Sequence, residues 1–256
     1  MLVLEKYTVN RDENGIVWFT INRQEKRNAI DYDVIEGFQQ TIFEVEANQG
    51  DKALVITGSG DRAFCAGGDL SAFQNLRTKQ QAYEMLSKMG EILYSIHTLS
   101  KPTVALINGI CIGGGCELAT ACDFRIASQV SKIGFVQGTL GITTGWGGAT
   151  MLLEKLPYAK AMEFLMTATV ISAQQGLEVG FVHKIVDSDR LQEECLSFLI
   201  PIVSKETNVL RAYKMVANQK WGIPFKEKMF AEIEQCAILW ETDEHHQAVD
   251  RFLKKS

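Results

Sequence analysis

The stretch INGICIGGGCELATACDFRIAS, residues 107–128, holds three consecutive glycines followed closely by a glutamate and an apolar run. An apolar strand over residues 103–107 leads into an Asn-Gly turn, a helix is expected from near Cys116, and residues 124–127 read as another strand. Glycine costs backbone entropy, so a triplet indicates backbone that approaches something closely or directs its N–H groups at it. Strands alternating with helices favour an α/β protein.

A second glycine turn, FCAGGDL at residues 64–70, also follows a short apolar strand and precedes a helix. The first N–H groups of a helix lack intrahelical partners, and the helix dipole favours negative charge there. If the two turns converge, their N–H groups could hold one oxygen from two sides, as an oxyanion hole does. Taken singly, each turn is better explained by a tight turn or by close packing of helix and strand. The chain has no P-loop, no G-x-G-x-x-G after its first strand and no G-x-S-x-G elbow.

The composition describes an ordinary globular chain of 256 residues with 46% hydrophobic residues, 22% charged residues and a net charge of −5. No block of lysine and arginine indicates a nucleic-acid or membrane partner, and the first ten residues contain no apolar signal segment. The six cysteines form no C-x-x-C pair, and the four histidines have no ligand spacing. We therefore expect reduced thiols, a cytoplasmic protein and no metal site.

The remaining pattern predicts a hairpin, several helices and a helical C-terminus. Expected strands cover residues 2–9, 16–21, 53–57 and 181–186; expected helices run from the Asp31 cap to Asn48, over 71–99 with one or two breaks, over 148–156 and 159–167, and from the Ser172 cap to Gly180. From residue 187 onward the chain reads as helical, with Pro201 and Pro224 as breaks. This divides the chain into a core, residues 1–200, and a C-terminal helical region, residues 201–256.

Four motifs together resemble the crotonase superfamily, also called the enoyl-CoA hydratase/isomerase family. They are INRQEKRNAI (21–30), RAFCAGGDL (62–70), the stretch 107–128 and ISAQQGLEVGFVHKIV (171–186). The resemblance covers nearly the whole chain and implies a spiral of ββα units with a C-terminal helical region, assembled as a homotrimer or homohexamer. It also implies an acyl-CoA thioester substrate, of which coenzyme A is a part, and no separate cofactor.

The resemblance assigns roles to individual residues. The thioester oxygen would accept hydrogen bonds from the N–H groups of Gly68 and Gly114, and Glu117 matches the first of two catalytic glutamates. The second matches Gln137, and an amide cannot exchange a proton near neutral pH. Trp146 either walls the acyl pocket or belongs to the core. Candidates for contacting coenzyme A are Arg23, Lys26, Arg27, Lys254 and Lys255 at the phosphates and Ala29 and Ala66 at the adenine, with Asp69 more plausibly a helix cap.

Because of Gln137, two other functions stay open. The segment CDFR…SKIGFV…GI…WGG, within residues 122–148, resembles the alkylmalonyl-CoA decarboxylase branch. Loss of CO₂ forms the enolate without a base, so methylmalonyl-CoA or ethylmalonyl-CoA could be decarboxylated with one glutamate and a glutamine. The third possibility is a family member that binds acyl-CoA without catalysis.

Overall fold

The computed structural model describes residues 5–254, and within them two β-sheets form the centre of the fold. The six-stranded sheet has the order β1-β2-β3-β5-β7-β10 and the four-stranded sheet the order β4-β6-β8-β9. The pairs β1–β2 and β8–β9 are antiparallel, and the other neighbours are parallel. The strands are β1 (Tyr7–Arg11), β2 (Ile16–Ile21), β3 (Ala53–Gly58), β4 (Ala63–Cys65), β5 (Thr103–Ile107), β6 (Ile110–Ile112), β7 (Phe124–Ser128), β8 (Lys132–Gly134), β9 (Ile171–Ser172) and β10 (Lys184–Val186).

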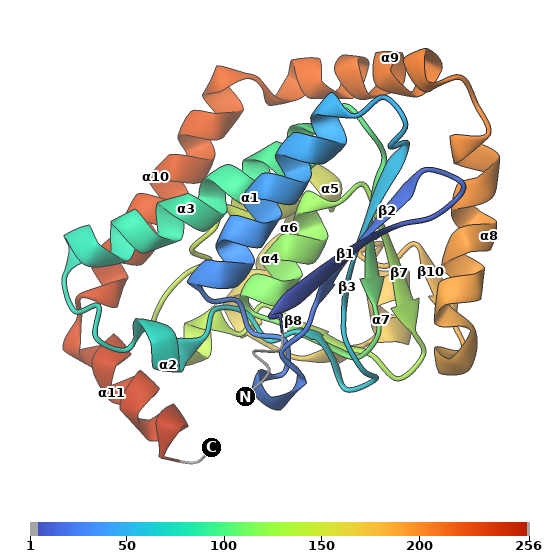
Figure 1. Cartoon of the computed structure of the whole chain (residues 1–256). Coiled ribbons are helices and arrows are strands. Elements are labelled where there is room, and N and C mark those ends of the chain that lie inside the picture. Colours follow the sequence, from blue (N-terminus) through green and yellow to red (C-terminus); the bar gives the residue numbers. More distant parts are fainter. Residues whose placement is uncertain (1–4, 255–256) are drawn as a thin grey trace.

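Helices surround the sheets. Those within the described residues are α1 (Tyr32–Ala47), α2 (Leu70–Phe73), α3 (Lys79–Thr98), α4 (Gly114–Ala121), α5 (Gly148–Lys155), α6 (Tyr158–Thr167), α7 (Ala173–Glu178), α8 (Leu191–Val203), α9 (Thr207–Asn218), α10 (Ile223–Trp240) and α11 (Asp243–Leu253), with 3₁₀ turns η1 (Gln24–Lys26), η2 (Gln137–Leu140), η3 (Ser188–Arg190) and η4 (Gln219–Trp221). In Figure 1, α8 to α11 form an outer arc, and α10 runs beside α3.

The chain winds as the predicted spiral of ββα units. Three times in succession a strand of the large sheet is followed by a strand of the small one: β3 by β4, β5 by β6, and β7 by β8. Each pair then leads into helical structure, beginning with α2, α4 and η2 respectively. This arrangement brings the ends of β4, β6 and β8 together, because the three strands are neighbours in one sheet. The α/β expectation is confirmed.

Local sequence signals explain the N-terminal elements. The Asp12 carboxylate accepts hydrogen bonds from the N–H groups of Asn14 and Ile16, which closes the predicted hairpin. Asp31 caps α1 by accepting a hydrogen bond of 3.2 Å from the N–H of Val34. The strand predicted at residues 2–9 is observed from Tyr7 to Arg11; residues 2–4 lie outside the described part of the chain.

Two apolar layers bury the faces of the large sheet. The larger one, which includes Phe19, Phe38 and Leu93, fills the space between the sheets and the helices α1, α3, α4 and α10. The smaller one, which includes Trp18 and Leu199, lies between the opposite face of the large sheet and α8. All six cysteines are free and buried, as predicted for core thiols. No helix within residues 5–254 is long and apolar enough to span a membrane.

The C-terminal half departs from the expectation at its prolines. Pro201 lies inside α8, which continues to Val203, and Pro224 lies in the first turn of α10, where a missing N–H costs nothing. Neither proline therefore breaks a helix. The predicted division at residues 200 and 201 falls within α8, and the separation of a core from a C-terminal region stays a prediction.

Candidate active site

The two glycine turns meet at the start of α4. Gly67 has a φ of +97°, which L side chains rarely adopt, and a Cβ on Gly67 would lie 3.0 Å from the backbone nitrogen of Gly114. The turn after β4 therefore packs directly against the first residue of α4. A bridge holds it there, because the N–H of Ile30 donates to the carbonyl of Gly67 and the N–H of Asp69 donates to the carbonyl of Ile30, both at 2.8 Å.

The predicted donors, Gly68 and Gly114, share this location. Gly114 is the first residue of α4, so its N–H has no intrahelical acceptor. Within residues 5–254, neither its N–H nor that of Gly68 has a protein hydrogen-bond acceptor. Both glycines also face one side chain: the Trp146 ring would overlap a Cβ on Gly114, and its Cζ2 would lie 3.6 Å from a Cβ on Gly68. The geometry thus brings together two unpaired donors.

Glu117 lies in the first turn of α4 and is only 2% exposed. Its Oε1 accepts hydrogen bonds from Gln137 Nε2 at 2.8 Å and from the N–H of Gly145 at 3.2 Å. Its Oε2 accepts from the N–H groups of Trp146 at 2.8 Å and Gly148 at 2.9 Å. Four donors therefore bind the carboxyl group, and four is the usual number of hydrogen bonds that an ionised carboxylate accepts.

Burial raises the pKa of Glu117 to about 8, and the charge of Glu232 acts in the same direction. Hydrogen bonds from the N–H groups of Trp146, Gly148 and Gly145 oppose this rise. A carboxyl group with such a pKa exists in both protonation states near neutral pH. Burial thus favours the protonated form of Glu117, whereas its four donors favour the ionised form.

Gln137 occupies the position predicted for a second glutamate and is buried beside the first. It begins η2, and its amide nitrogen donates to Glu117, so the motif alignment placed these two residues together correctly. Its Oε1 is buried and has no hydrogen-bond partner within the described residues. An unpaired buried acceptor is costly, and this one belongs to the same amide that binds Glu117. It is available to a donor on a substrate or a water.

A second carboxyl group does approach this region, but from α10. Glu232 accepts hydrogen bonds from Thr144 Oγ1, the N–H of Ala149, and both the N–H and Oγ1 of Thr150, at 2.5–3.0 Å. Nothing in the sequence spacing indicated this residue. Glu154, the glutamate nearest in sequence to the glycine-rich segment, instead forms an ion pair of 2.6 Å with Lys220.

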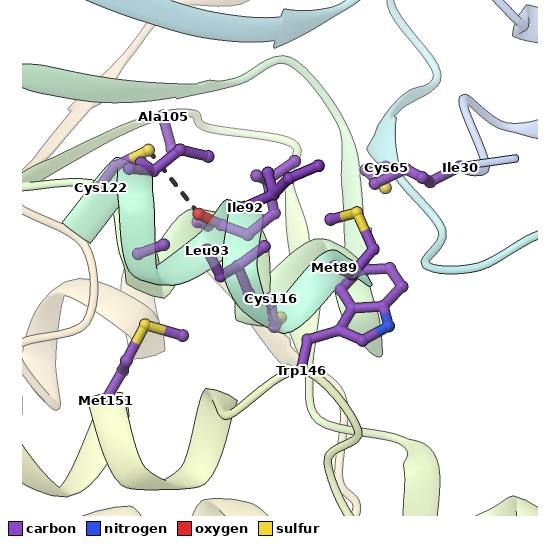
Figure 2. Close-up of a cluster of buried hydrophobic side chains, with 14 of the residues drawn as sticks. Ile30, Cys65, Met89, Ile92, Leu93, Ala105, Cys116, Cys122, Trp146 and Met151 are labelled. Atoms are coloured by element: carbon purple, nitrogen blue, oxygen red, sulfur yellow. Dashed lines mark hydrogen bonds between the residues drawn. The ribbon is translucent and has the colours of Figure 1, made fainter. Parts of the chain in front are cut away.

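Trp146 is 4% exposed and packs at the start of α4 (Figure 2). Figure 2 places its ring beside Met89 of α3 and close to the first turn of α4, which carries Cys116. The two sequence interpretations of Trp146 are therefore compatible. Its ring belongs to the core, and it covers Gly114 and Gly68 as well.

Two cations fix the other end of α4. Arg125 donates to the carbonyls of Ala119 and Cys122, and Lys155 donates to those of Thr120 and Cys122. Carbonyls at a helix C-terminus lack intrahelical partners, and positive charge is favourable there. This anchoring holds α4 rigidly behind the two glycine donors.

Arg23 does not occupy the position expected of a phosphate ligand. Its guanidinium is 9% exposed and pairs with Asp69 at 2.7 Å and Asp31 at 3.2 Å, and it also donates to the carbonyl of Ala29. These partners use the charge inside the protein, which favours a structural role for Arg23, and its coenzyme A interpretation stays a prediction. Asp69 caps α2 through the N–H of Ser71 at 3.0 Å, as its alternative interpretation predicted.

The other predicted coenzyme A residues differ in their exposure. Lys26 is exposed and donates to Ser71 Oγ at 3.2 Å, and the exposed Arg27 has a φ of +52°. Ala66 is half-buried and donates its N–H to the carbonyl of Arg27, whereas Ala29 is buried. Lys254 is exposed at the end of the described chain, and Lys255 lies outside it.

The fold places two glycine turns together at the start of the helix that carries Glu117. The family model of enoyl-CoA hydratase/isomerase matches residues 11–256, and the chain belongs to this family. It is thus an acyl-CoA enzyme of the hydratase/isomerase type.

Individual relatives differ in their named reactions. The chain is 32% identical to a crotonyl-CoA hydratase of Syntrophomonas wolfei over 99% of this chain and 97% of the relative. It is 31% identical to an ethylmalonyl-CoA decarboxylase of Xenopus tropicalis over 91% of this chain and 78% of the relative. The crystal structure of an enoyl-CoA hydratase from Bacillus anthracis superposes with a TM-score of 0.80 at 26% identity, covering 98% of this chain and 96% of that one.

Proposed function

We propose that the protein acts on a short-chain enoyl-CoA, with the thioester oxygen bound by the N–H groups of Gly68 and Gly114 and with Glu117 as the acid/base. The observation that carries this proposal is the meeting of two unpaired glycine N–H groups at the start of the helix that bears Glu117. Charge that leaves the Cα–Cβ system collects on the thioester oxygen as an enolate. Fixed donors stabilise that charge, each contributing about 2.7–4 kcal/mol in the transition state.

A single carboxyl group suits a double-bond shift. Glu117 would take a proton from one carbon and return it to another, which needs no second acid. Hydration requires two functions at once, because a water must be oriented while a proton is delivered to the neighbouring carbon. Gln137 could orient that water through its unpaired Oε1, although it supplies no proton. We therefore expect isomerisation to be at least as fast as hydration.

Decarboxylation of an alkylmalonyl-CoA is the second candidate, and Gln137 beside Glu117, at the position matched to a second glutamate, favours it. Loss of CO₂ forms the enolate without a base, so Glu117 has only one proton to deliver; in either reaction one of its four donors must first leave. In decarboxylation the bond between Cα and the carboxylate breaks, CO₂ leaves, and the electron pair enters the thioester enolate. Protonated Glu117 then supplies the proton that Cα takes up.

The test incubates the purified protein separately with crotonyl-CoA, 3-butenoyl-CoA, methylmalonyl-CoA and ethylmalonyl-CoA. Turnover of either enoyl-CoA at roughly 10 per second or more supports the first candidate. We expect Glu117→Gln to lower this turnover by about 100-fold or more. Glu163→Gln, an exposed substitution on α6, is the matched control.

The remaining outcomes separate the alternatives. CO₂ release without enoyl-CoA turnover assigns the decarboxylase. Acyl-CoA binding without turnover of any of the four substrates assigns a non-catalytic binding protein. Gln137→Glu supplies the missing carboxyl group and should raise hydration of crotonyl-CoA, whereas Gln39→Glu on the exposed face of α1 should not. No gain would mean that Gln137 does not occupy the water site.

We propose contacts for the coenzyme A and acyl parts of the substrate from the charge of the residues and from their position near the two glycine turns. Lys26 and Arg27 would contact the phosphates of coenzyme A, Ala66 and Ala29 would line its adenine end, and Trp146 would wall the acyl group. Coenzyme A enters as part of the substrate, and we propose no separate cofactor.

We also propose an assembly and a location for the protein. The resemblance to the family suggests a homotrimer or homohexamer, and the exposed apolar side chains of α9, among them Val209, Tyr213 and Val216, support a covered surface. Light scattering after size-exclusion chromatography measures the assembly directly. Six unpaired cysteines support a cytoplasmic location.

A further inference from the structure

Two carboxyl groups from different helices hold the segment 144–150, which leads into α5. Glu117 of α4 binds the N–H groups of Gly145, Trp146 and Gly148. Glu232 of α10 binds the next two N–H groups, of Ala149 and Thr150, and the hydroxyls of Thr144 and Thr150. The N–H groups of Gly148 and Ala149 are consecutive in the chain, yet each donates to a different carboxyl group. Segment 144–150 is thus fixed from both sides.

This segment carries the contacts on which the site depends. Trp146 lies within it and packs against Gly114 and Gly68. The backbone N–H groups that bind Glu117 belong to residues 145, 146 and 148, which lie between Thr144 and Ala149, two residues that Glu232 holds. A shift of α10 would therefore move the Trp146 ring and the donors to Glu117 together.

The two carboxyl groups also act on each other. Burial raises the pKa of Glu117, and the negative charge of Glu232 raises it further; burial also raises the pKa of Glu232, against its hydrogen bonds. The Cys236 thiol, on the same helix as Glu232, faces both and has its pKa raised by burial and by their charges. Several ionisable groups elsewhere on α3, α5 and α10 have their own partners: Lys79 with Glu234, Glu91 with Lys226, and Lys155 with the carbonyls of Thr120 and Cys122.

We propose that Glu232 is a positioning residue of this site, since it fixes the segment 144–150 and places a second negative group beside Glu117. The proposal rests on the acid/base role proposed for Glu117. It assigns the C-terminal helix α10 a part in setting the protonation state and surroundings of a residue on α4. Glu232 itself touches no substrate in this proposal.

The test compares Glu232→Gln, Glu232→Asp and Glu234→Gln. The glutamine keeps an acceptor oxygen for the N–H of Ala149 and removes the charge, whereas aspartate keeps the charge on a shorter side chain. Glu234 is on the same helix, 52% exposed in an ion pair with Lys79, and serves as the control. We expect the apparent pKa of kcat/KM assigned to Glu117 to fall by about one unit in Glu232→Gln and to stay near that of the unsubstituted protein in the other two variants.

A second measurement does not depend on activity. Carbon-13 NMR of protein labelled at the glutamate carboxyl carbons follows the titration of Glu117, whose signal is the one lost in Glu117→Gln. A downward shift of this titration in Glu232→Gln supports the positioning role of Glu232, whether or not any tested acyl-CoA substrate reacts. If none of these substrates reacts, that separate result contradicts the proposed function. An unchanged titration in Glu232→Gln overturns the proposal, whether or not kcat falls. If Glu232→Gln does not fold, a titration in Glu232→Asp that moves toward the ordinary glutamate pKa overturns it equally.

Discussion

At the scale of single residues, Gly114 shows why the glycine triplet is needed. Its N–H begins α4 without an acceptor within residues 5–254, and the Trp146 ring occupies the place where a Cβ would lie. Any other residue would either displace Trp146 or move the N–H. A steric requirement that does not involve the substrate thus explains why residue 114 is a glycine.

Replacing Gly114 by alanine should therefore damage activity more than folding. We expect kcat to fall by about 100-fold, comparable with the loss of one oxyanion donor. Overpacking against Trp146 should lower the free energy of unfolding by about 1–3 kcal/mol. Steady-state kinetics and urea unfolding measure the two effects. Gly138→Ala is the control, because a Cβ there would lie 3.6 Å from Ala168 in ordinary contact; full activity in Gly114→Ala would contradict the donor role.

The candidate site residues that belong to a short sequence motif were predictable, and those whose contacts lie in distant segments were not. Gly68, Gly114, Glu117 and Gln137 each sit within a motif, and the structure brings all four to one place. Glu232 was not predictable, because a glutamate within an amphipathic helix is ordinarily a surface residue and its partners lie in a distant segment. The burial of Arg23 was not predictable either: a basic residue in a turn suggests an exposed charge, but Arg23 is buried in ion pairs with two carboxylates.

At the scale of elements, long helices with caps were predictable and the small sheet was not. The helix over residues 32–47 has both an Asp31 cap and an apolar face, so its ends match the expectation closely. The strands β4, β6 and β8 have three residues each, too few for a period-2 pattern to show. Their pairing depends on the spiral of the whole chain, which local sequence does not encode.

The Arg23 network joins η1, α1 and α2, and we predict that it stabilises the fold without binding substrate. Arg23→Met would leave Asp69 and Asp31 without their buried partner, although Lys6 still pairs with Asp31 at 2.7 Å. We expect the free energy of unfolding to fall by about 3–5 kcal/mol, as when one member of a buried ion pair is lost. Denaturant unfolding provides the measurement.

Lys26→Ala makes the matched comparison, because Lys26 is exposed on the same 3₁₀ turn. Its removal should change the free energy of unfolding by less than about 0.5 kcal/mol and should raise the KM for an acyl-CoA substrate. A raised KM in a fully folded Arg23→Met variant, with no change for Lys26→Ala, would restore the original coenzyme A interpretation of Arg23.

At the scale of the whole molecule, buried ionisable groups make stability depend on pH. Burial raises the pKa of Glu117 from 4.5 to about 8, and burial lowers the pKa of Lys155 from 10.5 to about 7, with Arg125 adding to the second shift. Between pH 4.5 and 8 the folded chain therefore holds a proton on Glu117 that the unfolded chain has released. Between pH 7 and 10.5 the unfolded chain holds a proton on Lys155 that the folded chain lacks. The two groups act in opposite directions.

The sign for Glu117 follows from linkage, since stability falls with rising pH wherever the folded state binds more protons. Across pH 4.5–8 the free energy of unfolding of the unsubstituted protein should fall relative to that of Glu117→Gln by up to about 1.4 kcal/mol per pH unit. The Lys155 contribution is common to both proteins and cancels in this difference. Urea unfolding of the two proteins at half-unit intervals of pH measures it. A difference that stays constant from pH 4.5 to 8 would show that the four donors keep Glu117 ionised throughout. An ionised Glu117 cannot supply the proton that decarboxylation requires, whereas it is the form that can begin a double-bond shift.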